Sequence, residues 1–204
     1  MQGFSLQGLT PHHYRAAMID FPWKFSAGTK SRPQHYRRMT DPEIAAWPLE
    51  TLAHPDGCNF FIWITSPIDG PRFWEKIWPA WKRRGLRYSG RGFVWIKTHK
   101  TLGRAGEPLF FHRNSFHVST GFTTRKNAED ALLFKTGRPP RLANNIHEVI
   151  ISPLREHSRK PEEAYERIER YSAGPYADVF SRETRKGWDG FGDEATKFDA
   201  RIAS

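Results

Sequence analysis

The sequence contains a single cysteine, Cys58, among its 204 residues. One cysteine excludes an intramolecular disulfide and any zinc site built on several thiolates. No run approaches the roughly 18 consecutive apolar residues that a membrane-spanning helix needs. The segment from Met1 to Arg15 lacks the apolar core of a secretory signal. We therefore expect a reduced, cytoplasmic protein with no membrane partner.

Acidic residues are also scarce. The chain has 22 Asp and Glu against 32 Lys and Arg, which gives a net charge of +10, and 14% of its residues are aromatic. An excess of positive charge favours an anionic partner, and nucleic acid is the commonest one. Aromatic rings beside cations suit unstacked bases, because the rings stack on the base while the cations meet the backbone.

Short apolar runs alternate with helical patterns along the chain. The strand candidates are 14–19, 59–65, 92–97, 131–135, 148–151 and 176–180. The helix candidates are 41–47, 70–84 and 160–172. This alternation predicts an α/β fold with a mostly parallel sheet flanked by helices. No linker or repeat divides the chain, so we expect one domain over residues 1–204, with ligands bound beyond the carboxyl ends of the strands.

Two long segments, 24–38 and 98–117, combine cations with aromatic residues and almost no acids. Loops of this length are usually either functional or disordered. The composition leaves open a role in gripping the substrate and a solvated loop. The candidate substrate contacts within them are Lys24, Lys30, Arg32, Tyr36, Arg37 and Arg113.

Three segments at predicted strand or helix ends carry candidate chemistry. Asp20-Phe21-Pro22-Trp23 follows the first strand, although an Asp before a proline also suits a simple turn. The segment 155–161 opens the last predicted helix, and the segment 178–182 from the final strand leads into 187–194. Helix N-termini bind anions, so the second segment is a candidate site for a carboxylate.

With these motifs the sequence resembles the adenine methyltransferases related to the seventy-kilodalton catalytic subunit of the mRNA adenosine methyltransferase, a group with many phage and bacterial members. Their Asp-Pro-Pro-Trp signature is nearly matched by Asp20–Trp23. The matching segments are 20–23, 39–43, 61–65, 95–98, 121–129, 157–161 and 187–194. They occur in the family's order and cover nearly the whole chain.

The resemblance implies a Rossmann-like class I methyltransferase fold in a circularly permuted form, with the catalytic motif before the cofactor motif. It implies methylation of the N6 amine of adenine in DNA by S-adenosylmethionine, without a metal and with the target base flipped out of its stack. RNA adenosine as the substrate, and a non-catalytic nucleic-acid-binding relative, are the alternatives. A monomer or homodimer is expected, with a possible protein partner and a role in restriction-modification or phage biology.

The family pattern assigns the catalytic work to the first motif. The Asp20 carboxylate and the Phe21 carbonyl would accept the two amine hydrogens, Trp23 would stack on the base, and Pro22 would stiffen the turn. Positioning of this kind can account for roughly 7–11 kcal/mol of the barrier. Phe21 departs from the family, which has proline there, and a fixed φ is lost with that proline.

The cofactor contacts implied by the resemblance are Asp20, His157, Ser158, Lys160, Arg182, Thr184, Arg185, Asp193 and Glu194. For Lys160 a solvent-facing helix start is the alternative, and for 187–194 a structural turn. Arg125 and Asn127 are implied to lie near cofactor and substrate, and Glu129 is either a further ligand or a partner of Arg125. Trp63, Trp74, Trp78 and Trp95 are predicted to be core residues because each lies on a predicted strand or helix.

Overall fold

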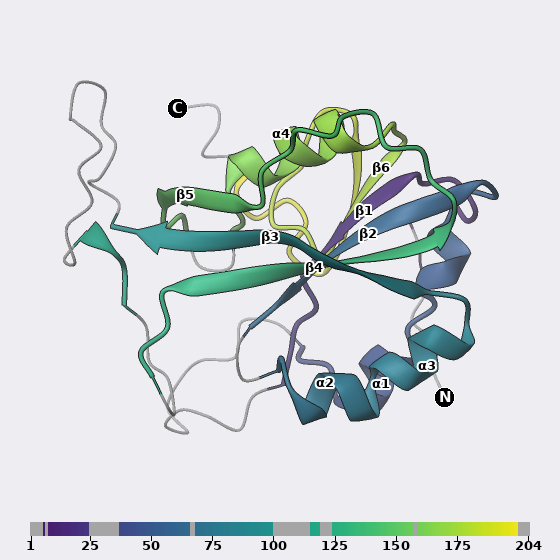
Figure 1. Ribbon diagram of the computed structural model, residues 1–204, viewed down its shortest axis with the longest axis horizontal. Coiled ribbons are helices and arrows are strands. Elements are labelled where there is room, and N and C mark those ends of the chain that lie inside the picture. The colour runs from purple at the N-terminus through teal and green to yellow at the C-terminus, as the bar shows by residue number, and fades with distance from the viewer. Residues whose placement is uncertain are drawn as a thin grey trace.

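The computed structural model describes residues 6, 8–24, 37–65, 68–99, 115–118, 124–156 and 159–199. Within these ranges the chain forms seven strands, four α-helices and one 3-10 turn (Figure 1). The strands are β1 (Ala16–Ile19), β2 (Gly57–Ile64), β3 (Arg87–Thr98), β4 (Ala128–Gly137), β5 (Val149–Pro153), β6 (Tyr176–Val179) and β7 (Trp188–Phe191). The helices are α1 (Asp41–Ala46), α2 (Pro71–Lys76), α3 (Trp78–Arg83) and α4 (Glu162–Tyr171), with a 3-10 turn at Leu49–Leu52.

The strands form one seven-stranded sheet in the order β5-β3-β4-β2-β1-β6-β7. Every neighbouring pair is parallel except the two that involve β4, which runs antiparallel to both β2 and β3. The predicted α/β fold with a mostly parallel sheet is confirmed, and the circular permutation stays a prediction. Because β4 is reversed, its first residues lie at the same edge of the sheet as the last residues of β1, β2 and β3.

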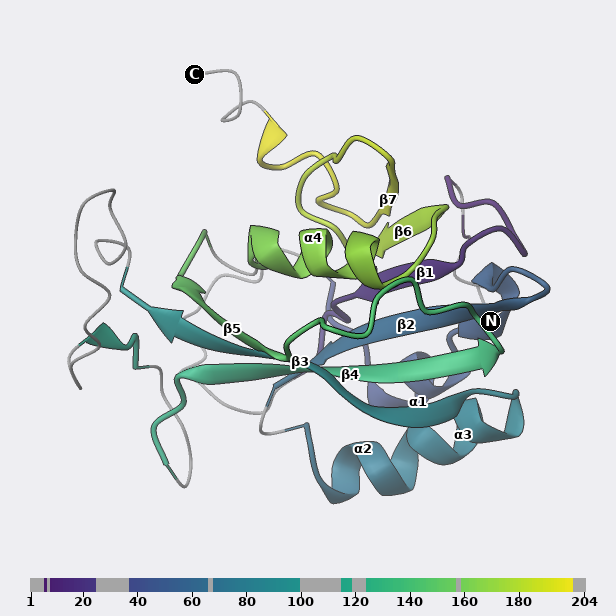
Figure 2. The ribbon, with the colours of Figure 1, turned by 45° about the horizontal axis from the view of Figure 1, so that its top comes forward.

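Helices cover both faces of the sheet (Figure 2). One buried cluster joins α1, α2 and α3 to side chains such as Ile19, Ile62 and Phe134. The other joins α4 to the opposite face, where Met18 and Trp63 point. Successive residues of a strand face opposite sides of the sheet, so the apolar runs predicted from the sequence supply both clusters.

The helix predicted over 70–84 is broken at Ile77 into α2 and α3. Pro79 lies in the first turn of α3, where its missing N–H is tolerated, but in one continuous helix its ring would clash with the preceding turn. The helix predicted over 41–47 is confirmed as α1. The Glu43 carboxylate accepts a 2.7 Å hydrogen bond from the Thr40 backbone N–H at its start.

The carboxy-terminal strands differ most from the prediction. The strand expected over 176–180 ends at Val179, because Phe180 has a φ of 64°. β7 was not predicted, since a strand of four residues bounded by glycines has little pattern. At Gly192, with a φ of 145°, an added Cβ would lie 2.9 Å from Phe180 Cα. Glycine therefore lets the end of β7 pack directly on the chain that follows β6.

Among the described residues, none of the helices is sufficiently long and apolar to cross a membrane.

Candidate active site

The Asp20–Trp23 turn lies where three parallel strands end together. β1 lies between β2 and β6, and Ile19 is in register with Ile62 on one side and Val179 on the other. The Asp20 backbone N–H donates a hydrogen bond to the Val179 carbonyl at 3.2 Å. The turn therefore leaves the sheet at the carboxyl edge, where an α/β sheet binds its ligands.

Hydrogen bonds tie the turn to the chain that precedes α1. The Phe21 carbonyl accepts from the Trp23 N–H at 2.8 Å, and the Pro22 carbonyl accepts from the Met39 N–H at 2.8 Å. The Met39 carbonyl in turn accepts from the Lys24 N–H at 3.2 Å. A carbonyl oxygen has two lone pairs, so Phe21 keeps acceptor capacity for a further donor.

The Phe21 side chain replaces the family proline with a ring that packs in the core. It is 2% exposed, and its ring centroid lies 5.3 Å from that of Phe180 and 5.6 Å from that of Trp23. The rings of Trp47 and Trp81 are each 5.7 Å away. The departure from the family motif is thus compensated by an aromatic cluster beneath the turn.

The Trp23 indole is also buried, at 4% exposure, and its Nε1–H donates to the Trp63 carbonyl at 3.3 Å. In this structure the ring fills the core below the turn, and its stacking on a base stays a prediction. Trp63 and Trp95 are buried as predicted. The remaining two predicted core tryptophans, Trp74 and Trp78, are partly buried and pack against the core.

A chain of alternating charges ends on Asp20. Lys160 Nζ lies 3.1 Å from Asp20 Oδ2 and 2.7 Å from Glu129 Oε1, and Lys97 Nζ lies 2.8 Å from Glu129 Oε2. The Lys160 and Glu129 side chains are only 6% and 7% exposed. Lys160 is therefore no solvent-facing helix start. The second carboxylate that it binds, Glu129, comes from the reversed strand β4.

Burial and pairing act in opposite directions on these groups. Burial raises the pKa of Glu129, but Lys160 and Lys97 outweigh it and bring that pKa to about 2. Burial lowers the pKa of Lys160, and the two carboxylates outweigh it and raise that pKa. For Asp20 burial dominates and raises its pKa, against the attraction of Lys160. Glu129 and Lys160 thus stay charged, and Asp20 is the more easily protonated carboxylate.

A hollow opens beside Asp20, between the ends of β1 and β6 and the start of α4. Its lining residues are Met18, Asp20, Arg159, Lys160, Tyr165, Asp178, Phe180, Ser181, Arg182 and Glu183. The buried Ser181 Oγ has no hydrogen-bond partner within the described part of the chain. Carboxylates, an ammonium and an unpartnered hydroxyl suit a ligand that carries amine, carboxylate and hydroxyl groups, as S-adenosylmethionine does.

A second buried carboxyl, Asp178 on β6, lines the same hollow. Its Oδ2 accepts from the Tyr165 hydroxyl of α4 at 2.8 Å, and the Arg185 guanidinium stacks 3.7 Å from the centre of the Tyr165 ring. Burial raises the pKa of Asp178 to about 7, although Tyr165 and Arg185 both lower it. The sequence analysis included Asp178 in the motif that leaves the last strand but gave it no partner, and it did not single out Tyr165.

The raised pKa of Asp178 makes stability depend on pH. The native state holds the Asp178 proton more tightly than the unfolded chain does, so this group's contribution to stability falls as pH rises from about 4 to about 7. We expect Asp178→Asn to gain in melting temperature relative to the wild type across that window. Thermal unfolding of both proteins over the window tests this, and a difference that is independent of pH contradicts it.

The predicted cofactor residues after β6 are largely paired with carboxylates. Arg182 pairs with Glu194, and Arg185 pairs with Glu162 of α4. The Thr184 N–H donates to Asp199 Oδ1 at 2.7 Å. Asp193 is exposed. Of this group the structure brings only Arg182 to the lining of the hollow beside Asp20.

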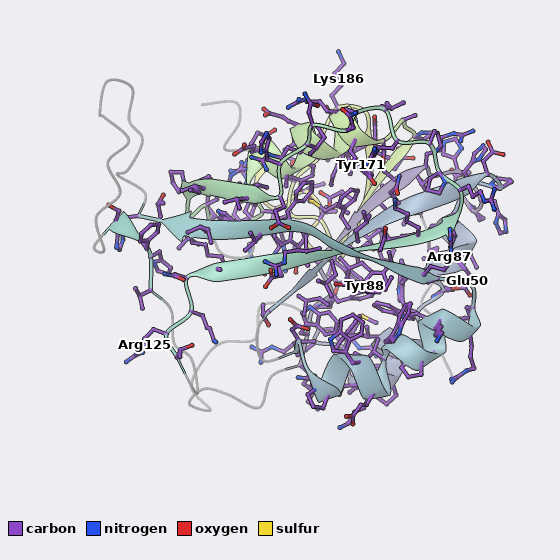
Figure 3. The ribbon with its side chains drawn as sticks, in the orientation of Figure 1. Glu50, Arg87, Tyr88, Arg125, Tyr171 and Lys186 are labelled. Carbon is purple, nitrogen blue, oxygen red and sulfur yellow. The ribbon has the colours of Figure 1, made fainter. Side chains whose placement is uncertain are left out.

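The predicted substrate residues that the structure describes lie around the same edge. Lys24 is exposed just after the turn, and Arg37 pairs with Glu43. The Asn127 carbonyl accepts from the Lys97 N–H at 2.8 Å. Arg125 is exposed on the side of the sheet where β3 ends, far from Glu50 and Arg87 (Figure 3). The predicted residues that lie outside the described ones are Lys30, Arg32, Tyr36, Arg113, His157 and Ser158.

The sequence analysis missed Lys97 and left Glu129 open between a ligand and a partner of Arg125. The structure pairs Glu129 with Lys97 and Lys160. The sequence signal that could have indicated Lys97 is its place in the family-like segment Trp-Ile-Lys-Thr at the end of β3. In the part of the chain that the structure describes, no three His, Cys, Asp or Glu side chains group closely enough to hold a metal ion.

Comparison with known proteins agrees with the geometry. The MT-A70 family model matches residues 14–194. Human N(6)-adenine-specific methyltransferase METTL4 is 29% identical over 195 residues, which is 89% of this chain and 37% of the human protein. The chain thus spans just over a third of the length of this relative. Because the family model covers most of the chain, from before β1 to the end of the motif that contains β7, the protein belongs to the MT-A70 family.

Proposed function

We propose that this protein is an S-adenosylmethionine-dependent methyltransferase that modifies the exocyclic N6 amine of adenine in DNA. Membership of the MT-A70 family and the similarity to a human protein named for N6-adenine methylation support the reaction. The observation that carries the proposal is the ion pair of Asp20 with the buried Lys160 at the end of β1, beside a hollow lined by the unpartnered Ser181 hydroxyl.

The amine of adenine is a poor nucleophile because its lone pair is delocalised into the ring. In the proposed complex Asp20 accepts one amine hydrogen through its carboxylate, and Phe21 accepts the other through its carbonyl oxygen. Holding both hydrogens turns the nitrogen lone pair toward the methyl donor. S-adenosylmethionine supplies a methyl group on a cationic sulfur. The buried carboxylates, Lys160 and the Ser181 hydroxyl are the groups that would hold the donor.

The substrate proposal rests on charge. The chain carries a net +10, so a polyanion is the expected partner. An adenine in a duplex has its amine buried, and the base must leave its stack to reach Asp20. RNA adenosine offers the same base edge and the same backbone charge, and it is therefore the alternative substrate.

The test incubates the purified protein with labelled S-adenosylmethionine and matched duplex DNA, single-stranded DNA and RNA. Nucleoside mass spectrometry identifies the product, and Asp20→Ala is the control. N6-methyladenine in DNA that disappears in the variant supports the proposal, and methylation of RNA alone favours the alternative substrate. If none of the three nucleic acids is methylated and calorimetry detects no binding of S-adenosylmethionine, the enzyme proposal fails.

A non-catalytic nucleic-acid-binding protein is the alternative of a different class. Phe21 is its support in the sequence, because it breaks the family motif. The packing of Phe21 into the aromatic cluster leaves Asp20 ion-paired at the edge of the hollow. That arrangement favours the enzyme over the binding protein.

A further inference from the structure

The charge chain that ends on Asp20 contains two residues, Lys97 and Glu129, beyond the Asp20–Lys160 pair. It runs from Lys97 at the end of β3 through Glu129 at the start of β4 to Lys160 before α4, and from there to Asp20 after β1. Its three contacts are 2.8, 2.7 and 3.1 Å. Each contact joins two opposite charges, and the four residues come from four different segments of the fold.

Two tryptophan rings hold the two lysines in place. Lys97 Nζ lies 4.8 Å from the centre of the Trp95 ring, and Lys160 Nζ lies 5.1 Å from that of Trp63. The two rings contact each other edge to face at 6.4 Å between centroids. Cation–π contact at this distance stabilises a desolvated ammonium. The positions of the lysines are thus fixed by the core as well as by their carboxylates.

We propose that Lys97 is a positioning residue that acts through Glu129: it neutralises this carboxylate, so that Lys160 stays bound to Asp20 and the Asp20 carboxylate keeps its charge and its orientation. The inference rests on the proposed function for its catalytic meaning. The electrostatic part concerns the resting protein and can be tested without turnover.

The number of charges explains why Lys97 is needed. Glu129 and Asp20 are two carboxylates that contact one ammonium, Lys160. Without Lys97, Glu129 would draw Lys160 toward itself, and two like charges would share one counterion in a buried site. Like charges in such a site raise the pKa of one member of the pair. Lys97 supplies the second cation and leaves the chain neutral.

The groups that face Asp20 limit what else could shift its charge. Among the described residues they are Lys160 before α4, Glu129 on β4, Arg182 after β6 and Asp178 on β6. Only Glu129 is in direct contact with Lys97. An effect of Lys97 on Asp20 that passes through Glu129 must therefore become much smaller when Glu129 loses its charge.

The experiment measures the pKa of Asp20 by carbon-13 NMR of aspartate carboxyls, with Asp20→Asn to assign the signal. We expect Lys97→Met to raise that pKa by about one unit and Glu129→Gln to lower it. When Lys97→Met is combined with Glu129→Gln, it should raise the pKa of Asp20 by at most about a third of the rise it causes alone. The acid limb of the rate of methyl transfer against pH should move in the same directions.

Lys135→Met is the matched control. Lys135 lies on β4, donates to the Tyr171 hydroxyl at 3.0 Å and lies 5.6 Å from that ring, so it too is a lysine held by an aromatic side chain. Its replacement should leave the pKa of Asp20 unchanged. Lys97→Arg keeps the cation and should restore wild-type behaviour. If Lys97→Met does not fold, Lys97→Gln takes its place in the same comparison with and without the Glu129 charge.

The outcomes separate the inference from the function. An Asp20 pKa that is the same in Lys97→Met and Lys135→Met overturns the inference, as does an equal effect of Lys97→Met with and without the Glu129 charge. If the NMR shifts occur as expected while the wild type methylates no substrate, the charge chain stands and the proposed function fails.

Discussion

Replacing Asp20 with asparagine is expected to lower the turnover number for methyl transfer by at least about 100-fold. Asparagine keeps the shape of the side chain but places a donor NH2 group where the amine hydrogens and Lys160 both need an acceptor. Lys160 keeps Glu129, 2.7 Å away, so the buried ammonium does not lose its last partner. The measurement is kcat and KM with labelled S-adenosylmethionine, together with thermal unfolding.

Asp56→Asn is the matched control for this prediction. Asp56 is also paired with a cation, Arg15 at 2.8 Å, but it precedes β2 and lies at the opposite edge of the sheet. Its replacement should leave kcat within about twofold of the wild type. A fall in kcat of the same size in both variants would mean that Asp20 acts through the stability of the fold and not on the substrate.

Truncating Phe21 to alanine is expected to cost about 3–5 kcal/mol in the free energy of unfolding. The ring is 2% exposed and contacts the rings of Trp47, Trp81 and Phe180. Those rings come from different parts of the chain, so the void cannot close by a local shift. Urea unfolding of the purified protein, followed by tryptophan fluorescence, measures the loss.

Two further variants separate packing from backbone geometry at Phe21. Phe21→Leu keeps most of the apolar volume and should cost about 1 kcal/mol. Phe21→Pro restores the family motif but removes the ring, so its stability should resemble that of the alanine variant. A proline variant as stable as the wild type would show that the aromatic cluster does not depend on Phe21.

The features that follow from local sequence were predictable. The apolar runs that became β1, β2 and β6 are short and buried on both sides, and the pattern of α4 has acidic residues in its first turn and one apolar face. The location of Asp20 also follows from sequence, because a residue just after a parallel strand lies at the ligand-binding edge. The direction of β4 could not be predicted, since an antiparallel strand has the same apolar run as a parallel one.

This reversal accounts for much of what was missed in the site. Ligand-binding residues of parallel sheets are sought after strands, whereas Glu129 lies at the beginning of β4. Tyr165 lies within α4, where an isolated Tyr has no motif around it, and the motif that contains Asp178 on β6 does not indicate its partner. Their pairing depends on how α4 packs over β6, and packing between distant segments cannot be predicted from short sequence patterns.

The charge chain also constrains how this sequence can diverge over evolution. Losing one member leaves an uncompensated ion in the interior, at a cost of about 3–5 kcal/mol, whereas losing two paired members removes both ions together. Lys97 and Glu129 form such a pair, at 2.8 Å, one step away from Asp20. In descendants of this protein we expect these two positions to change in concert or not at all, while Asp20 and Lys160 stay fixed for as long as the chemistry is under selection.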